Sequence, residues 1–241
     1  MNSLSTASPE EIAKFSAIAD SWWDEKGKFK PLHRFNPIRI EFLKAKLGQH
    51  FNRDITLERP FLGLSLLDVG CGGGLIAEPM ARLGFEVTAI DASAKNIAVA
   101  SLHAEKSEIA INYQNAQPEE LKGQYDVVLI LEVVEHVADL GQFIHAVAGL
   151  LKQGGALMGA TVARTLKSYA LAIVGAEYIL QWLPKGTHDW NKFLNPSEFV
   201  EALRQEGVKI KALQGIAYNL LKDEWYNSQD LDVNYLLWAE K

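Results

Sequence analysis

The sequence predicts an α/β fold: a doubly wound, mostly parallel sheet of seven strands with an antiparallel edge strand. Short apolar runs alternate with segments of helical spacing through the middle of the chain. A glycine-rich loop follows the first of these runs, which is typical of a strand that leads directly into a helix. Two final apolar runs near the carboxyl terminus predict a closing hairpin, and this hairpin supplies the antiparallel edge.

Each predicted strand corresponds to one apolar run, and the fourth run, at 125–131, is apolar enough to lie in the centre of a parallel sheet. Helical spacing is found after Leu75, at 140–151 and at 196–205, and each of these segments separates two predicted strands. The predicted strands are 65–69, 85–90, 109–113, 125–131, 156–160, 208–216 and 233–239.

Three regions are expected along the chain. Residues 1–50 precede the first strand, are rich in aromatic side chains and predict a helical N-terminal cap. Residues 51–241 form the ligand-binding domain that holds the sheet. A long segment at 164–195 follows the fifth strand and is predicted to be an insertion outside the sheet.

Composition limits the classes of function. The chain has 241 residues, 48% of them hydrophobic, which is ample for one large core. Its net charge of −6 argues against nucleic acid as a partner. Cys71 is the single cysteine, so neither a disulfide framework nor a thiolate metal site is expected. No export signal is recognised at the amino terminus, and the expected location is the cytoplasm.

The glycine loop and its flanking carboxylates predict the ligand. Gly70 and Gly72 allow the backbone to approach a ligand closely, and Asp91, at the end of the second strand, has the spacing of a ribose-binding carboxylate. Asp68 lies at the tip of the first strand, where it would repel a pyrophosphate and attract a cation. This charge favours S-adenosylmethionine over a nicotinamide cofactor, which remains the alternative.

Several segments outside the loop identify a narrower family. The sequence resembles the ubiquinone-biosynthesis O-methyltransferases, which are class I methyltransferases, from about Glu11 to Tyr235. The segments that carry this resemblance are Trp22-Trp23-Asp24 and the runs at 29–39, 174–180, 184–190 and 230–235. It implies methyl transfer to a ring hydroxyl of polyprenyl catechols and phenols, namely 3-demethylubiquinol and 2-polyprenyl-6-hydroxyphenol. An NAD(P)-dependent oxidoreductase and a non-catalytic lipid-binding scaffold are the alternatives from other classes.

The resemblance also assigns residues around the cofactor and shows one departure. It implies that Arg39 pairs with the carboxylate of the cofactor, while Leu131 ends the fourth strand where the methionine portion should pass. From the predicted topology alone, Ala116 and Gln117, which follow the third strand, are expected to border the adenine. The family usually has Ser-Thr-x-Asn-Arg after the fifth strand, whereas Ala163 replaces the asparagine in this chain.

A cluster after the fourth strand predicts the chemistry. Glu132, Glu135 and His136 have the spacing of one helix face, so two carboxylates and an imidazole would converge there. Carboxylates suit magnesium, and the resemblance implies a magnesium ion held by these three residues. Glu132 and His136 are the predicted catalytic residues. In the alternative interpretation these side chains brace the helix, and His136 is a candidate base.

The insertion between Lys167 and Trp190 predicts contact with a lipid surface. It is mostly apolar, and lysines and tryptophans lie toward its ends. Its apolar run is shorter than the roughly 20 residues that span a bilayer. The chain is therefore expected to lie on the inner face of the cell membrane, bound to anionic lipid through this lid, and the resemblance adds a possible ubiquinone-biosynthesis complex. A buried structural helix is the alternative.

Overall fold

The computed structural model describes residues 6–171, 189–219 and 222–241. Its centre is one eight-stranded sheet in the order β3-β2-β1-β4-β5-β8-β6-β7. The strands are β1 (Ser65–Val69), β2 (Glu86–Asp91), β3 (Asn112–Asn115), β4 (Tyr125–Leu131), β5 (Leu151–Val162), β6 (Lys209–Asn219), β7 (Glu224–Ser228) and β8 (Asn234–Glu240). The order reverses between β1 and β4, so the chain winds outward in both directions from the middle of the sheet.

The doubly wound, mostly parallel fold predicted from the sequence is confirmed, with one strand more than expected. Strands β1 to β5 are mutually parallel, whereas β8 runs antiparallel to both β5 and β6. The additional strand, β7, pairs antiparallel with β6 and forms the outer edge of the sheet. Its sequence, Glu-Trp-Tyr-Asn-Ser, lacks an apolar run because much of the strand is exposed.

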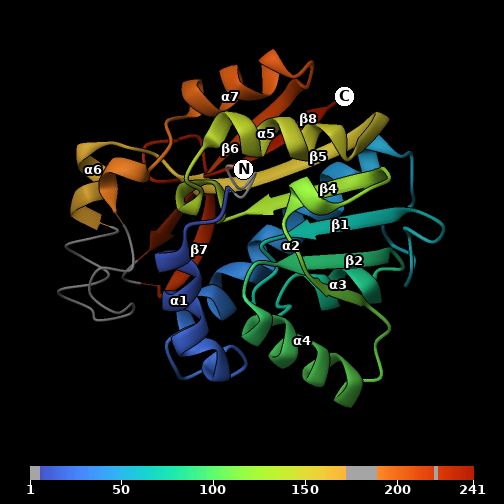
Figure 1. The fold of residues 1–241 in the computed structure, drawn as a ribbon. Helices are drawn as coiled ribbons and strands as arrows, with labels where there is room; N and C mark the ends of the chain where they lie inside the picture. Colours follow the sequence, from blue (N-terminus) through green and yellow to red (C-terminus); the bar gives the residue numbers. More distant parts are fainter. Residues whose placement is uncertain (1–5, 172–188, 220–221) are drawn as a thin grey trace, which may run out of the picture.

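Helices cover both faces of the sheet (Figure 1). They are α1 (Pro9–Ile18), α2 (Lys30–His50), α3 (Ala77–Arg82), α4 (Ala94–Lys106), α5 (Leu140–Gly149), α6 (Leu166–Ser168) and α7 (Pro196–Gln205), with 3-10 turns η1 (Ala19–Ser21), η2 (Pro118–Glu120), η3 (Val134–His136) and η5 (Trp190–Lys192). Consecutive residues of β1 show why both faces are apolar. Leu66 packs into the core with α2 and α3, while Leu67 packs into the core with α5 and α7.

The N-terminal region divides into two parts with different roles. Helix α2 buries Phe42, Leu43 and Leu47 against the sheet and is therefore part of the core rather than of a cap. Helix α1 buries no residue fully, and it lies beside the carboxyl ends of the parallel strands (Figure 1). The boundary at residue 50 stays a prediction.

The predicted insertion is described only at its two ends, because residues 172–188 lie outside the described part. At its beginning, the Thr165 side chain accepts a hydrogen bond from the Ser168 backbone N–H and caps α6. At its end, the Leu194 carbonyl accepts a hydrogen bond from the hydroxyl of the buried Tyr235 of β8 at 2.7 Å. In the described ranges no helix is long and apolar enough to cross a membrane.

The Tyr235 hydrogen bond should contribute measurably to stability, because the phenol and its partner are both buried. Replacing Tyr235→Phe leaves the Leu194 carbonyl without this donor, so the free energy of unfolding should fall by about 1–3 kcal/mol. Urea denaturation measures this loss. The matched control is Tyr226→Phe on the exposed strand β7, where 45% of the residue is accessible and the expected change is within about 0.5 kcal/mol. Equal losses in the two variants would contradict the role given to the buried bond.

Candidate functional site

The carboxyl ends of β1, β2 and β4 open into one large cavity of about 590 Å³. Helix α1, the loop after it and the start of α2 close the cavity from the other side. The residues predicted from the sequence all border it: Arg39, Asp68, Gly70, Gly72, Asp91, Ala116, Gln117, Leu131, Glu132, Glu135 and His136. Because side chains from positions 39 to 136 come together here, the sequence-based choice of residues corresponds to one place in the fold.

The glycine loop after β1 requires a backbone that other residues rarely adopt. Gly70 has a φ of 72° and Gly72 a φ of 53°, both in the left-handed region. A Cβ on Gly72 would lie 2.5 Å from the Trp22 ring, and one on Gly70 would lie 2.8 Å from Val133. These two positions therefore need glycine for steric reasons as well, and the loop is held tightly between the N-terminal segment and the turn after β4.

Asp91 fastens this loop to the end of β2. One carboxylate oxygen accepts from the Gly72 backbone N–H at 2.9 Å, and the other accepts from the Ser93 N–H at 2.8 Å and from the Asn96 amide at 3.1 Å. Burial raises the pKa of Asp91, and these three donors oppose the rise. A carboxylate oxygen has two lone pairs, so Asp91 can bind a ribose hydroxyl while it holds the loop.

Two opposite charges are buried in the cavity without complete hydrogen bonding. Among the described residues, Arg39 has no partner for its Nε and Nη2, and Asp68 has none for one carboxylate oxygen. The Arg39 guanidinium lies 4.1 Å from the centre of the Phe35 ring. Burial and then the nearby Asp91 raise the pKa of Asp68 to about 7, while Arg39 lowers it. Buried, unsatisfied groups of both signs are suited to a zwitterionic ligand.

The turn after β4 differs from the expected helix. Val134–His136 is a single 3-10 turn, and Glu132 precedes it with a φ of 54° in the left-handed region. The expected helix face is therefore wrong, although Glu132, Glu135 and His136 all border the cavity. Over the described ranges no group of three or more His, Cys, Asp or Glu side chains could hold a metal ion, so the predicted magnesium set does not fit.

The three side chains of the predicted magnesium set border the same cavity but differ in their hydrogen-bond partners. Glu135 is buried and accepts a hydrogen bond from Thr161 at 2.9 Å, and burial, followed by the charge of Glu132, raises its pKa to about 8. One oxygen of Glu132 is buried without a partner in the described part. His136 contacts Glu11 of α1, with 3.0 Å between Nδ1 and a carboxylate oxygen. The bracing interpretation holds in part, because Glu135 links the turn to β5.

Two tryptophans of the N-terminal segment contribute to the site, and sequence reasoning gave them no site role. Trp22 stacks on Phe29 at 3.7 Å and donates its indole N–H to Asn96 at 3.0 Å. Trp23 donates its indole N–H to the Gly73 carbonyl at 2.9 Å. The Trp22-Trp23 pair was visible in the sequence as a family-specific segment, but its contact with a loop 50 residues away was not.

The far part of the cavity is an aromatic wall formed by α2 and the β6–β7 hairpin. The rings of Phe35 and Trp225 lie 4.5 Å apart, and Ile216, Tyr218 and Tyr226 border the same space. The Arg39 guanidinium lies over the ring of Phe35, which belongs to this wall. The charged and aromatic parts of the cavity are therefore continuous. Strand β7, which the sequence did not predict, supplies Trp225 and Tyr226.

Ala163, the departure from the family pattern, lies outside this wall. It is fully buried in the core with α5 and α7, and its backbone N–H donates to the Val233 carbonyl at 2.8 Å. An asparagine there would need a partner for its amide in an apolar environment. The alanine fits these apolar surroundings without a polar partner.

Comparisons with known proteins show the family of this chain. A methyltransferase-domain family matches residues 39–213. The ubiquinone biosynthesis O-methyltransferase of Paramagnetospirillum magneticum is 56% identical, with 100% of this chain and 98% of that protein covered. That of Caulobacter vibrioides is 52% identical, over 97% of this chain and 94% of that protein.

Solved structures at low identity share the fold. The magnesium protoporphyrin IX methyltransferase of Synechocystis PCC 6803 with bound SAH has a TM-score of 0.64 at 19% identity, covering 96% of this chain and 99% of that one. The N-methyltransferase NodS of Bradyrhizobium japonicum, with S-adenosylhomocysteine, has a TM-score of 0.63 at 14% identity, covering 96% and 98%. With full-length relatives above 50% identity and a matching domain family, this chain belongs to the ubiquinone biosynthesis O-methyltransferases.

Proposed function

We propose that this chain transfers the methyl group of S-adenosylmethionine to a ring hydroxyl of polyprenyl catechols and phenols, namely 3-demethylubiquinol and 2-polyprenyl-6-hydroxyphenol. The names of its full-length relatives support the pathway. The observation that carries the proposal is the unsatisfied pair of Arg39 and Asp68 beside the glycine loop. A ligand with one ammonium and one carboxylate satisfies both groups, whereas the negative charge of Asp68 would repel a pyrophosphate.

The remaining cofactor contacts follow from the positions of the strand ends. Arg39 binds the carboxylate of the methionine portion and Asp68 binds its ammonium. Asp91 binds the ribose hydroxyls, and Gly70 and Gly72 leave room for the ligand along the loop. Leu131, which is buried at the end of β4 and borders the cavity, supports a path for the methionine portion there. The S-adenosylhomocysteine (SAH) bound in two structural neighbours supports a cofactor of this type.

The acceptor ring occupies the aromatic wall of the same cavity. Phe35, Trp225 and Ile216 provide apolar contact for a substituted ring and for the first part of a prenyl tail. Glu132 keeps one carboxylate oxygen available for a hydroxyl of the acceptor. Charged substrates would gain little from this wall, which therefore favours an aromatic, lipid-like acceptor.

The residues of the chain position the acceptor oxygen and remove its proton. His136 lines the cavity, and in the described part its Nε2 has no hydrogen-bond partner. It accepts the proton of the reacting hydroxyl, and the phenolate oxygen bonds the methyl carbon as the carbon–sulfur bond breaks. S-adenosylmethionine supplies an electrophilic methyl carbon on a sulfonium, and the bonding electron pair remains on the sulfur of the product thioether. Glu132 holds the acceptor during this step.

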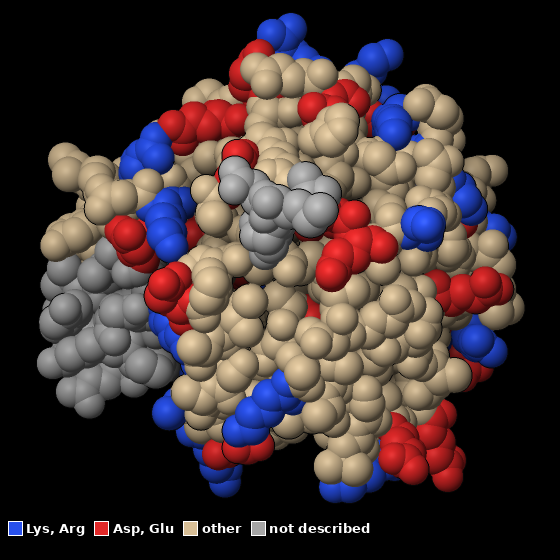
Figure 2. All heavy atoms as spheres, in the orientation of Figure 1, with Lys and Arg blue, Asp and Glu red and all other residues tan. Residues whose placement is uncertain are grey.

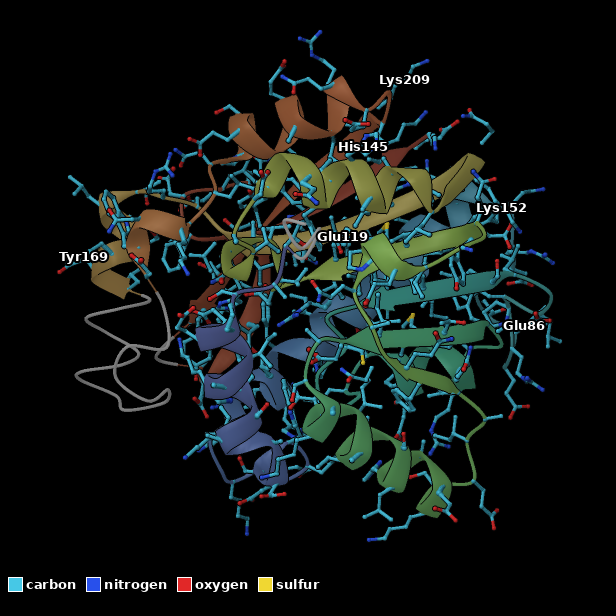
Figure 3. All side chains as sticks on the ribbon, viewed as in Figure 1. Glu86, Glu119, His145, Lys152, Tyr169 and Lys209 are labelled. Carbon is cyan, nitrogen blue, oxygen red and sulfur yellow. The ribbon has the colours of Figure 1, made fainter. Side chains whose placement is uncertain are left out.

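The enzyme reaches its lipid-like substrate at a membrane surface. Leu166, Tyr169 and Leu171 are 83%, 47% and 53% exposed at the start of the insertion, and Tyr169 lies at the outer edge of the molecule beside α6 (Figure 3). Lys167 is paired with Asp230, so apolar contact is the main support for binding there. The rest of the predicted membrane-facing segment, 172–188, lies outside the described residues.

The charges on the visible face support membrane binding through a local apolar contact rather than through a large positively charged surface. Figure 2 shows Lys and Arg side chains interspersed with Asp and Glu side chains across this face. With a net charge of −6, an anionic surface would repel the protein as a whole. The inner face of the cell membrane remains the proposed location, and a complex with other enzymes of the pathway stays a prediction.

Cofactor affinity should depend on pH through Asp68. Its carboxyl has a pKa of about 7 in the ligand-free protein, and only the ionised form attracts the ammonium of the cofactor. Binding measured by calorimetry should weaken about eightfold between pH 7.5 and pH 6, the change in the ionised fraction. The Asp68→Asn variant should bind more weakly and lose this component of the pH dependence. A dependence that is the same in wild type and variant would contradict the role of Asp68.

The pKa of Asp68 also has a consequence for the ligand-free fold. Because the folded pKa lies above the ordinary value of 3.8, the unfolded chain ionises first as the pH rises. This group therefore lowers stability progressively between about pH 4 and pH 7. A bound ammonium favours the ionised carboxylate and opposes that loss.

His136 should be required for turnover but not for cofactor binding. With a short-tail 3-demethylubiquinol as acceptor, His136→Gln should lower kcat by about 10²–10⁴-fold, the usual contribution of a general base. Calorimetry should show unchanged affinity for S-adenosylmethionine. The matched control is His145→Gln on α5, because the ring of His145 also contacts a carboxylate, Glu206 at 2.9 Å, but is 75% exposed. Wild-type turnover by His136→Gln would refute the assignment of the base.

Membrane binding should depend on the exposed leucines near α6. Flotation with anionic liposomes should fall when Leu166 and Leu171 are both replaced by Ser, as should activity on long-tail substrates. The control pair is Leu57→Ser and Leu62→Ser, which are 58% and 54% exposed in the loop before β1. That loop lies at the amino-terminal edge of the parallel strands, away from the cavity. Equal effects of the two pairs would show that binding is not specific to the α6 end.

A further inference from the structure

We propose that Glu11, on helix α1, is the positioning residue that orients the catalytic imidazole of His136. This inference rests on the proposed function, in which His136 takes the proton of the acceptor. Helix α1 would then help to orient the base as well as close the cavity. The two residues are 125 positions apart in the sequence and meet only because α1 packs beside the turn after β4.

The contact between them is short and enclosed. A carboxylate oxygen of Glu11 lies 3.0 Å from Nδ1 of His136, and the side chains are only 18% and 16% exposed. The Phe15 ring, one turn further along α1, meets the imidazole edge-on with 5.0 Å between ring centres. The ring of His136 is therefore fixed on one edge by a hydrogen bond and on one side by an aromatic contact.

The charge of Glu11 determines which ring nitrogen carries the proton. The Glu11 carboxylate, which Lys14 and Lys192 also face, is ionised near neutral pH and can only accept a hydrogen bond. Nδ1 must therefore carry a hydrogen. In the neutral imidazole this leaves a lone pair on Nε2, the nitrogen that has no partner in the described part of the chain. The pair with Glu11 thus selects the tautomer that can act as a base toward the cavity.

Neighbouring contacts keep Glu11 in place. The chain just before α1 pairs with the chain just after His136, through a bridge between Ala7 and Val137 and a hydrogen bond from the Ala138 N–H to the Thr6 carbonyl at 2.7 Å. These contacts fix the start of α1 relative to the turn and set Glu11 opposite the imidazole.

Two cations also face the Glu11 carboxylate. Lys14 lies 3.6 Å from one of its oxygens, and Lys192 of η5 lies 3.6 Å from the other. The turn after β4, helix α1 and the end of the insertion therefore meet at one carboxylate.

The test measures turnover in full-length variants that carry Glu11→Gln, His136→Gln or both, with S-adenosylmethionine and a short-tail 3-demethylubiquinol. Glu11→Gln should lower kcat by about 10- to 100-fold, the usual loss when an orienting partner of a histidine is removed. The KM for the acceptor and the calorimetric affinity for S-adenosylmethionine should stay within twofold of wild type. The matched control is Glu206→Gln, which removes the same kind of contact from the exposed His145 and should not change kcat.

A double-mutant cycle separates positioning from an independent effect. Because Glu11 acts through His136, adding Glu11→Gln to His136→Gln should cost no further activity. In protein labelled with ¹⁵N-histidine, the His136 signals should report a hydrogen on Nδ1 in wild type and a mixture of tautomers in Glu11→Gln. The ring signals lost in His136→Gln identify this residue among the six histidines.

The outcomes distinguish this inference from the proposed function. Wild-type kcat in Glu11→Gln, with a large loss in His136→Gln, would overturn the positioning role and leave the base in place. Wild-type kcat in His136→Gln would overturn the proposed base itself. Multiplying losses in the double variant, or weaker cofactor binding with unchanged kcat, would show that Glu11 only helps to hold the cap and would also overturn the inference.

Discussion

The buried charges at the carboxyl edge of the parallel strands are the constraint on which the site depends. Arg39 comes from a core helix, Asp68 from β1, and Glu132 and Glu135 from the turn after β4, and all four face one cavity. The fold leaves polar atoms of each of these side chains without partners among the described residues. Leaving such groups buried costs free energy, so a ligand that completes their hydrogen bonds gains affinity.

The two helices of the N-terminal segment that border the cavity differ in how deeply they are buried. Helix α1 buries no residue fully, and its contacts include the Ser16–Ser93 hydroxyl pair at 2.6 Å and the partly buried Ile18. Helix α2, in contrast, is anchored by buried aromatic and leucine side chains. A weakly buried helix next to a strongly buried one is a physical basis for opening the site while Arg39 stays in position.

The sequence was sufficient to predict the parts of the fold that depend on local pattern. Strands such as Tyr125–Leu131 are apolar on both faces, and the loop at Gly70 and Gly72 has a composition that only a close backbone approach explains. The position of β7 was missed because exposed edge strands carry no apolar alternation. The turn at Glu132 was missed because a left-handed residue there, which ends the helical spacing, leaves no signal in residue type.

Long-range polar pairs were the other part that the sequence could not predict. Nothing near Glu11 distinguishes it from its exposed neighbour Glu10, since both lie in the first turn of a helix, where acidic residues are common. What separates them is the direction of each side chain once α1 has packed: Glu10 bonds to Ser8, whereas Glu11 faces His136. The residues that bind the cofactor could be found from the chain itself, because strand ends and glycine loops are local. The residue that orients the base depends on how distant segments pack, and only the folded chain identifies it.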